Sequence, residues 1–162
     1  MKKVLIILFF NSISVFSQVP NKPNCLTVKE TDVLKLKNNK MKNPGKNVFG
    51  NELELAGTSP LTGFYRDGFC ATGINDSGLH VVAAVMTIEF LKFSKAQGND
   101  LITPNPAYGF PGLKPGDVWC LCANRWKEAF ANDVAPPVLL KATHLKALEI
   151  INFDDLKSKA LP

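Results

Sequence analysis

Three cysteines and two histidines are the side chains in this sequence best suited to chemistry. Cys120 and Cys122 lie two residues apart in a short apolar run, and Cys70 precedes them. A thiolate is a nucleophile and a metal ligand, and a neighbouring histidine can act as its base. The candidate catalytic residues are therefore Cys70, Cys120, Cys122, His80 and His144.

The spacing of the cysteines limits which disulfides can form. In a strand, the Cα atoms of Cys120 and Cys122 would lie about 6.7 Å apart with both thiols on one side. That distance is at the upper limit for a disulfide, so a bond between the two would need a bent strand. In an oxidising compartment the simplest arrangement is a disulfide from Cys70 to one of them, with the other packed as a small apolar residue.

The alternatives to a structural disulfide or plain core packing are a metal site and a reactive thiol. Neither histidine has a partner at a typical zinc-ligand spacing, so the metal signal is poor. We predict no metal ligands and no cofactor. A lone histidine near a helix start is also often a structural, hydrogen-bonded residue, which is the alternative for His144.

The N-terminus has the features of a secretory signal peptide. Lys2 and Lys3 precede an apolar run over residues 4–10, and small residues around Ser17 suggest cleavage there. The run is shorter than the roughly 20 residues that a membrane span needs, which disfavours the alternative of an uncleaved anchor. We expect the protein to be exported, to the periplasm or beyond, without a stable membrane anchor.

The basic charge is concentrated in the leader and the segment after it. The formal net charge is +5, but residues 18–46 alone carry seven lysines against two carboxylates. From residue 47 onward, ten basic and twelve acidic residues give a charge of −2. The sequence therefore divides into a signal peptide (1–17), a lysine-rich linker (18–46) and a single globular domain (47–162), with no nucleic-acid partner expected.

The domain is predicted to be α+β, with a small mixed sheet built from three strand-cap-helix (βα) units and a β-hairpin. An α/β three-layer arrangement is the alternative. The hairpin is expected at 62–70, around the turn-forming pair Asp67-Gly68. In the first unit, strand 80–86 is followed by Thr87, which caps helix 88–96. In the second, strand 118–122 is followed by Asn124, which caps the next helix. In the third, strand 138–142 is followed by Thr143, which caps helix 144–150. A last helix is expected over 153–160, capped by Asn152.

These elements suggest a ligand site. If the three units run parallel, the backbone N–H groups at Thr87, Asn124 and Thr143 face one crevice that suits a phosphate or carboxylate. Arg66 could add a bidentate contact, and Asp100 lies in a proline-rich loop, 99–116, that could close over the crevice. The alternatives are that these residues only cap helices, that Arg66 pairs with a surface carboxylate, and that the loop aromatics cover a sheet edge.

Several short strings in one order make the chain similar to the domain-of-unknown-function family 2237. They are NVFG at 47–50, TGFYRDG at 62–68, GNDL at 98–101, FPGLK at 110–114, GDVWCLC at 116–122 and ATH at 142–144. The resemblance covers residue 47 to the C-terminus and implies no activity, substrate or cofactor. Many members carry cysteine where this chain has Ala56, Phe69 and Ala83, and most lack a signal peptide, so this chain resembles an exported variant.

Three functions remain as hypotheses, and the sequence does not decide whether the protein is an enzyme. The first is binding of a small anionic ligand at the clustered helix N-termini. The second is a thiol-dependent enzyme or redox protein using Cys70, Cys120 or Cys122. The third is a protein-interaction module with an unspecified partner, which predicts an exposed apolar patch.

Overall fold

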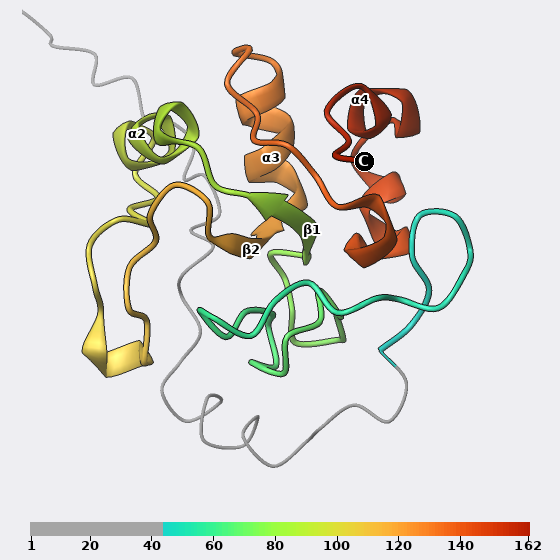
Figure 1. The fold of residues 1–162 in the computed structure, drawn as a ribbon, viewed down its shortest axis with the longest axis horizontal. Helices are drawn as coiled ribbons and strands as arrows, with labels where there is room; N and C mark the ends of the chain where they lie inside the picture. The colour runs from blue at the N-terminus through green and yellow to red at the C-terminus, as the bar shows by residue number, and fades with distance from the viewer. Residues whose placement is uncertain (1–43) are drawn as a thin grey trace, which may run out of the picture.

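A computed structural model describes residues 44–162 (Figure 1). The predicted signal peptide and almost all of the predicted linker lie outside the described residues. In chain order the elements are β1 (His80–Val85), α2 (Ile88–Ala96), the 3₁₀ helix η1 (Pro106–Tyr108), β2 (Val118–Cys122), α3 (Ala123–Phe130), η2 (Leu140–Ala142), η3 (Leu145–Glu149) and α4 (Phe153–Ser158). Residues 44–162 therefore form an α+β domain.

The sheet consists of β1 and β2, which pair antiparallel. Val85 lies opposite Val118, and His80 lies opposite Cys122, with a shift of register between His80 and Val82. Figure 1 shows α2 and α3 on one side of the two strands and the chain from 44 to 79 on the other. The parallel arrangement on which the predicted crevice depends is therefore not found in the described strands.

The third predicted strand, 138–142, is reduced to isolated bridges. Val138 pairs with Ala84 on β1 and with Ala160 near the C-terminus. Because η2 begins at Leu140, the backbone leaves the edge of β1 after one bridge and cannot extend the ladder.

The predicted hairpin at 62–70 is a series of tight turns instead. A type I′ turn needs positive φ at both central residues. Here Arg66 (φ 54°) and Gly68 (φ 90°) have positive φ, while Asp67 between them does not. The carboxylate of Asp67 accepts a hydrogen bond from the N–H of Phe69, which stabilises a local turn rather than a two-residue loop.

Two of the four predicted helix caps are confirmed. The hydroxyl of Thr87 accepts from the N–H of Phe90 at the start of α2, and the side chain of Asn152 accepts from the N–H of Asp154 in α4. The last helix ends at Ser158, two residues before the predicted end.

The other two predicted caps are wrong, because the tertiary structure uses those positions differently. Helix α3 begins at Ala123, so Cys122 is its N-cap residue and Asn124 is an exposed residue of its first turn. Thr143 is fully buried, and its hydroxyl accepts from the N–H of Ala83 on β1 instead of capping η3. The ring of His144 caps η3.

The core lies on both faces of the strands. On the helix side, Phe90 of α2 and Trp126 of α3 are fully buried against β1 and β2. On the other side lies a small cluster of short side chains: Ala56, Cys70, Ala83, Cys120 and Ala142. Alternation along a strand explains the division, because successive side chains point to opposite faces.

The proline-rich loop 99–116 is anchored at its base and exposed at its tip. The N–H of Leu113 donates to the carbonyl of Leu101, and Phe110 packs edge-on against Trp119 at 5.4 Å between ring centroids. Tyr108, at the tip, is exposed. The alternative in which loop aromatics pack onto the sheet therefore holds for Phe110.

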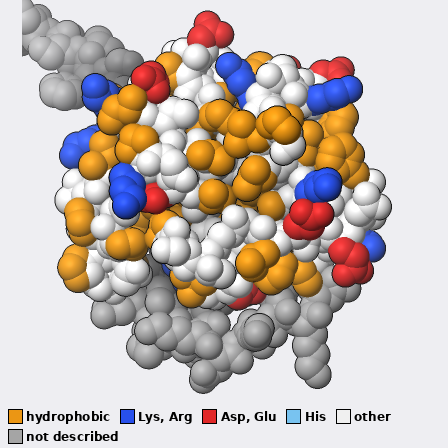
Figure 2. Space-filling view, in the orientation of Figure 1, with side chains coloured by type: hydrophobic (Ala, Val, Ile, Leu, Met, Phe, Trp, Pro, Cys, Tyr) orange, Lys and Arg blue, Asp and Glu red, His pale blue; other side chains and the backbone are white. Residues whose placement is uncertain are grey.

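Apolar side chains also reach the surface. Figure 2 shows them gathered in the middle of one face, with charged residues mainly around them. The exposed apolar side chains of the described chain include Ile74, which is fully exposed, and Phe49 and Leu55, which are about half exposed. Between residues 44 and 162, no helix is long and apolar enough to cross a membrane.

Candidate functional site

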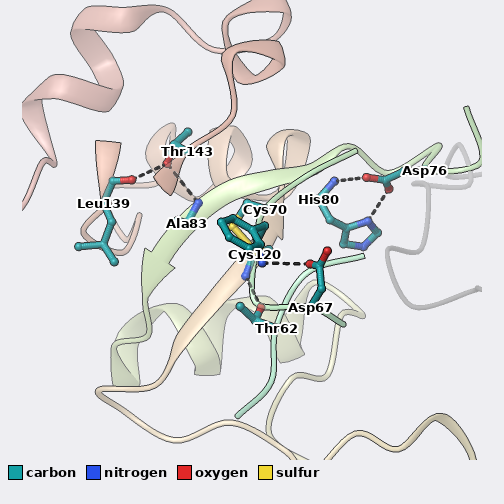
Figure 3. Close-up of a disulfide and its surroundings, with 10 residues drawn as sticks. Thr62, Asp67, Cys70, Asp76, His80, Ala83, Cys120, Leu139 and Thr143 are labelled. Atoms are coloured by element: carbon teal, nitrogen blue, oxygen red, sulfur yellow. Dashed lines mark hydrogen bonds and ion pairs between the residues drawn. A yellow bond between two sulfur atoms is a disulfide. The ribbon is translucent and has the colours of Figure 1, made fainter. Parts of the chain in front are cut away.

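A disulfide joins Cys70 to Cys120 and ties the turns before β1 to the middle of β2 (Figure 3). Both residues are buried, with relative exposures of 0% and 2%. Next to the disulfide, the hydroxyl of Thr62 accepts a 2.8 Å hydrogen bond from the N–H of Cys120. This confirms the expected pairing of Cys70 with one of the two strand cysteines. A wholly buried disulfide among alanines is typical of a structural bond.

Cys122 occupies a different environment from Cys120. It is the last residue of β2 and the N-cap residue of α3, and its side chain makes no capping hydrogen bond. Cys122 is also disulfide-bonded, and its partner is not Cys70 or Cys120. The partial positive charge of a helix N-terminus stabilises a thiolate. Reduction of this bond would release a thiol at the N-cap position of α3.

His80 lies directly across the sheet from Cys122 and is held by Asp76. Its Nδ1 lies 2.6 Å from Asp76 Oδ1, and its backbone N–H donates to Asp76 Oδ2 at 2.9 Å. The carboxylate of Asp76 is completely buried, whereas the imidazole of His80 is 16% exposed. Phe64 stacks on the imidazole at 5.9 Å (Figure 3 shows the Asp76–His80 pair). A buried carboxylate at Nδ1 fixes both the orientation and the tautomer of a histidine.

Gly78 separates the imidazole from the sulfur. A Cβ added at Gly78 would lie 2.9 Å from Cε1 of His80 and 3.3 Å from Sγ of Cys122. Both side chains therefore pack against the same side of this glycine. Cys122 and His80 are therefore neighbours, and Asp76 holds the imidazole, so the three residues are of the types that serve as nucleophile, base and orienting carboxylate.

Tyr65 lies near the carboxylates of this cluster. Burial raises the pKa of its hydroxyl, and the negative charges of Asp76 and then Asp67 raise it further. The hydroxyl lies against Gly73, where an added Cβ would collide with it. The hydroxyl of Tyr65, which borders the site, is therefore uncharged over the physiological pH range.

The predicted ligand-binding residues are not brought together. Because β1 and β2 are antiparallel, α2 follows one end of the sheet and α3 follows the other, so Thr87 and Asn124 lie at opposite ends. Thr143 is buried behind β1, and Asp100 forms an ion pair with Lys95 at 2.9 Å. The crevice of helix N-termini is therefore not formed.

The fifth predicted ligand residue, Arg66, stacks over the ring of Trp119 at 4.6 Å. Burial lowers the pKa of its guanidinium. The surface-carboxylate alternative for Arg66 is not observed, because no carboxylate of residues 44–162 forms an ion pair with it.

His144 has a structural environment. Its Nδ1 accepts a hydrogen bond from the N–H of Lys146, its own N–H donates to the carbonyl of Val81, and its Nε2 packs against Gly45. Only His80 of the two histidines faces a cysteine across the sheet.

We expect His144 to make the stability of the protein pH-dependent. Burial lowers its pKa, the charge of Lys146 lowers it further, and Glu149 opposes them. Because the unfolded chain then binds the proton first, the contribution of His144 is complete above its ordinary value of 6.5 and is lost as pH falls below it. Asn can accept from Lys146 without titrating, so His144→Asn should reduce the loss of unfolding free energy between pH 7.5 and pH 5 measured by urea denaturation. An unchanged pH dependence would contradict this assignment.

Asp76 was not among the residues predicted from sequence. The available signal was an acidic residue four positions before a histidine, in a short turn bounded by Gly73 and Gly78. Such spacing is common, and only the fold shows that the carboxylate turns back onto His80. Over residues 44–162, no group of three or more His, Cys, Asp or Glu side chains could hold a metal ion.

Comparison with known proteins identifies one family. The family model described as "Uncharacterized protein conserved in bacteria (DUF2237)" matches residues 46–160. This confirms the family resemblance noted from the sequence strings. A search of curated proteins found no match.

Proposed function

We propose that this chain, which belongs to the DUF2237 family, is an exported thiol–disulfide exchange protein in which Cys122 supplies the exchanging sulfur. The observation that carries the proposal is the position of Cys122 across the sheet from His80, whose imidazole is held by the buried carboxylate of Asp76. Disulfides persist in exported compartments, which agrees with the predicted signal peptide and with the bonded state of all the described cysteines.

The chemistry is a transfer of two electrons and two protons from a substrate dithiol to the disulfide at Cys122. A substrate thiolate attacks the sulfur bonded to Cys122, and Cys122 leaves as a thiolate. The second substrate thiol then attacks the mixed disulfide and releases the other protein sulfur. The substrate ends as a disulfide, and the protein ends with two thiols.

The site favours Cys122 as the leaving group. Cys122 has a relative exposure of 3%, so its own sulfur is shielded from a substrate thiolate. The departing thiolate is stabilised by the N-terminus of α3, and His80 lies opposite Cys122 with its imidazole held by Asp76. Thiols whose thiolates are stabilised leave faster in exchange.

The two disulfides should therefore differ in their rates of reduction. The Cys70–Cys120 bond lies instead in an apolar cluster with Ala56, Ala83 and Ala142. With dithiothreitol under native conditions, we expect Cys122 to become reduced at least about 10-fold faster than Cys120, as followed by quenching, alkylation and peptide mass spectrometry.

His80→Gln should slow the reduction at Cys122 by about 10-fold and leave Cys70–Cys120 unchanged. His144→Gln, at the other histidine, is the matched control and should change neither rate. Circular dichroism verifies that each variant is folded. Equal reduction rates for the two disulfides, or the same rate at Cys122 in wild type and His80→Gln, would refute the proposal.

A further inference from the structure

The two arginines of the sequence lie in contrasting environments. Arg125 is buried in α3, and its guanidinium donates to Glu128 at 3.0 Å and to the carbonyl of Gln97 at 3.3 Å. Arg66 is half-buried, but none of its guanidinium N–H groups has a hydrogen-bond acceptor among residues 44–162. A guanidinium has five N–H donors, and partly burying them without acceptors is costly.

The surroundings of Arg66 hold the guanidinium in place without neutralising it. Its plane lies over Trp119, which is itself fixed from another side by Phe110. The backbone of Arg66 is in the left-handed region, within a turn closed by the hydrogen bond from its N–H to Gly63. Stacking on an aromatic ring leaves the donor edge of a guanidinium available.

The nearest carboxylates in sequence are already used. Asp67 accepts from the N–H of Phe69, and Asp76 holds His80. Burial is the sole cause of the lowered pKa of Arg66, with no opposing contribution from an acidic neighbour. The site therefore carries one uncompensated positive charge on a planar group.

From this geometry we infer that Arg66, stacked on Trp119, anchors a binding site for a small monocarboxylate. A carboxylate matches a guanidinium edge with two parallel hydrogen bonds and equals it in charge. A phosphate dianion would require a second cation, and within residues 44–162 Arg66 is the one cation over this ring. The inference is independent of the thiol chemistry at Cys122.

The test is a titration of the oxidised protein with sodium benzoate, followed by the NMR signals of the Arg66 side-chain Nε–H and the Trp119 indole N–H. We expect saturable shifts with a dissociation constant in the millimolar range. Acetate should also give saturable shifts, because it carries the same carboxylate, and inorganic phosphate should not bind more tightly than benzoate.

Arg66→Lys keeps the charge but loses the bidentate fork, so it should weaken benzoate binding at least about 10-fold. Arg66→Gln should abolish the binding, whereas Arg125→Lys, at the paired arginine, should leave it unchanged. Melting temperatures verify that each variant is folded. Absence of saturable shifts in wild type, tighter binding of phosphate, or equal affinity in Arg66→Gln would each overturn the inference, and none of these outcomes bears on disulfide exchange.

Discussion

Replacing Cys70 and Cys120 together by alanine is expected to lower the free energy of unfolding by about 4 kcal/mol. The bond closes a sequence separation of 50 residues, and removing it restores the conformational freedom of that loop to the unfolded chain. Since it also connects the turns before β1 to β2, its loss weakens the packing of the small alanine-rich cluster. Urea denaturation and calorimetry should show the effect, with a fall in Tm of about 15 °C.

A serine pair at the same positions gives the matched comparison. Cys70→Ser with Cys120→Ser places two hydroxyls in a buried apolar cluster, so it should cost more than the alanine pair. A loss of less than about 1 kcal/mol in the alanine pair would show that the disulfide contributes little to the native fold.

The largest chemical effect is expected for a reduced Cys122 thiol. Cys25 is the fourth cysteine of the sequence and lies outside the described residues. In a Cys25→Ser background with Cys70–Cys120 intact, Cys122 is the single remaining thiol. If His80 and Asp76 act on it as a unit, His80→Gln and Asp76→Asn should each lower its alkylation rate at neutral pH, by on the order of 10²-fold for His80→Gln.

The double variant of Asp76 and His80 tests whether the two residues act on Cys122 together or independently. Asp76 acts through His80, so combining Asp76→Asn with His80→Gln should lower the rate no further than His80→Gln alone. The midpoint of the rate–pH profile should rise in every variant, which a merely structural role would not produce. Additive losses, or profiles that coincide with that of the parent, would contradict the assignment of Asp76 as a positioning residue.

Sequence patterns predicted the elements correctly where interactions between residues close in sequence determine the structure. Helix α2 begins after Thr87 and is followed by Gly98 with a φ of 80°, as the capping pattern predicted. The apolar runs of β1 and β2 were also located correctly, because strand-length runs bounded by turns have few alternatives.

The errors arose where a side chain serves a distant segment. Thr143 has the sequence context of a helix cap, but its hydroxyl bonds Ala83, 60 residues away. The parallel arrangement that the predicted crevice requires fails for the same reason, since the pairing of β1 with β2 is decided between distant segments. The candidate site was predicted in part: Cys122 and His80 were named, whereas Asp76 and the contact of Arg66 with Trp119 required the fold.

Because the register shifts between His80 and Val82, the site depends on the number of residues in β1. Uninterrupted pairing from Ala83 opposite Cys120 would place Val81 opposite Cys122 and turn His80 to the other face of the sheet. The one additional residue that β1 has at the register shift places His80 opposite Cys122 instead. A deletion of a single residue here would preserve the apolar character of the strand and the identity of every polar group, yet separate the imidazole from the sulfur. The spacing between Asp76 and Ala83 is therefore as diagnostic of the site in relatives as the residues themselves.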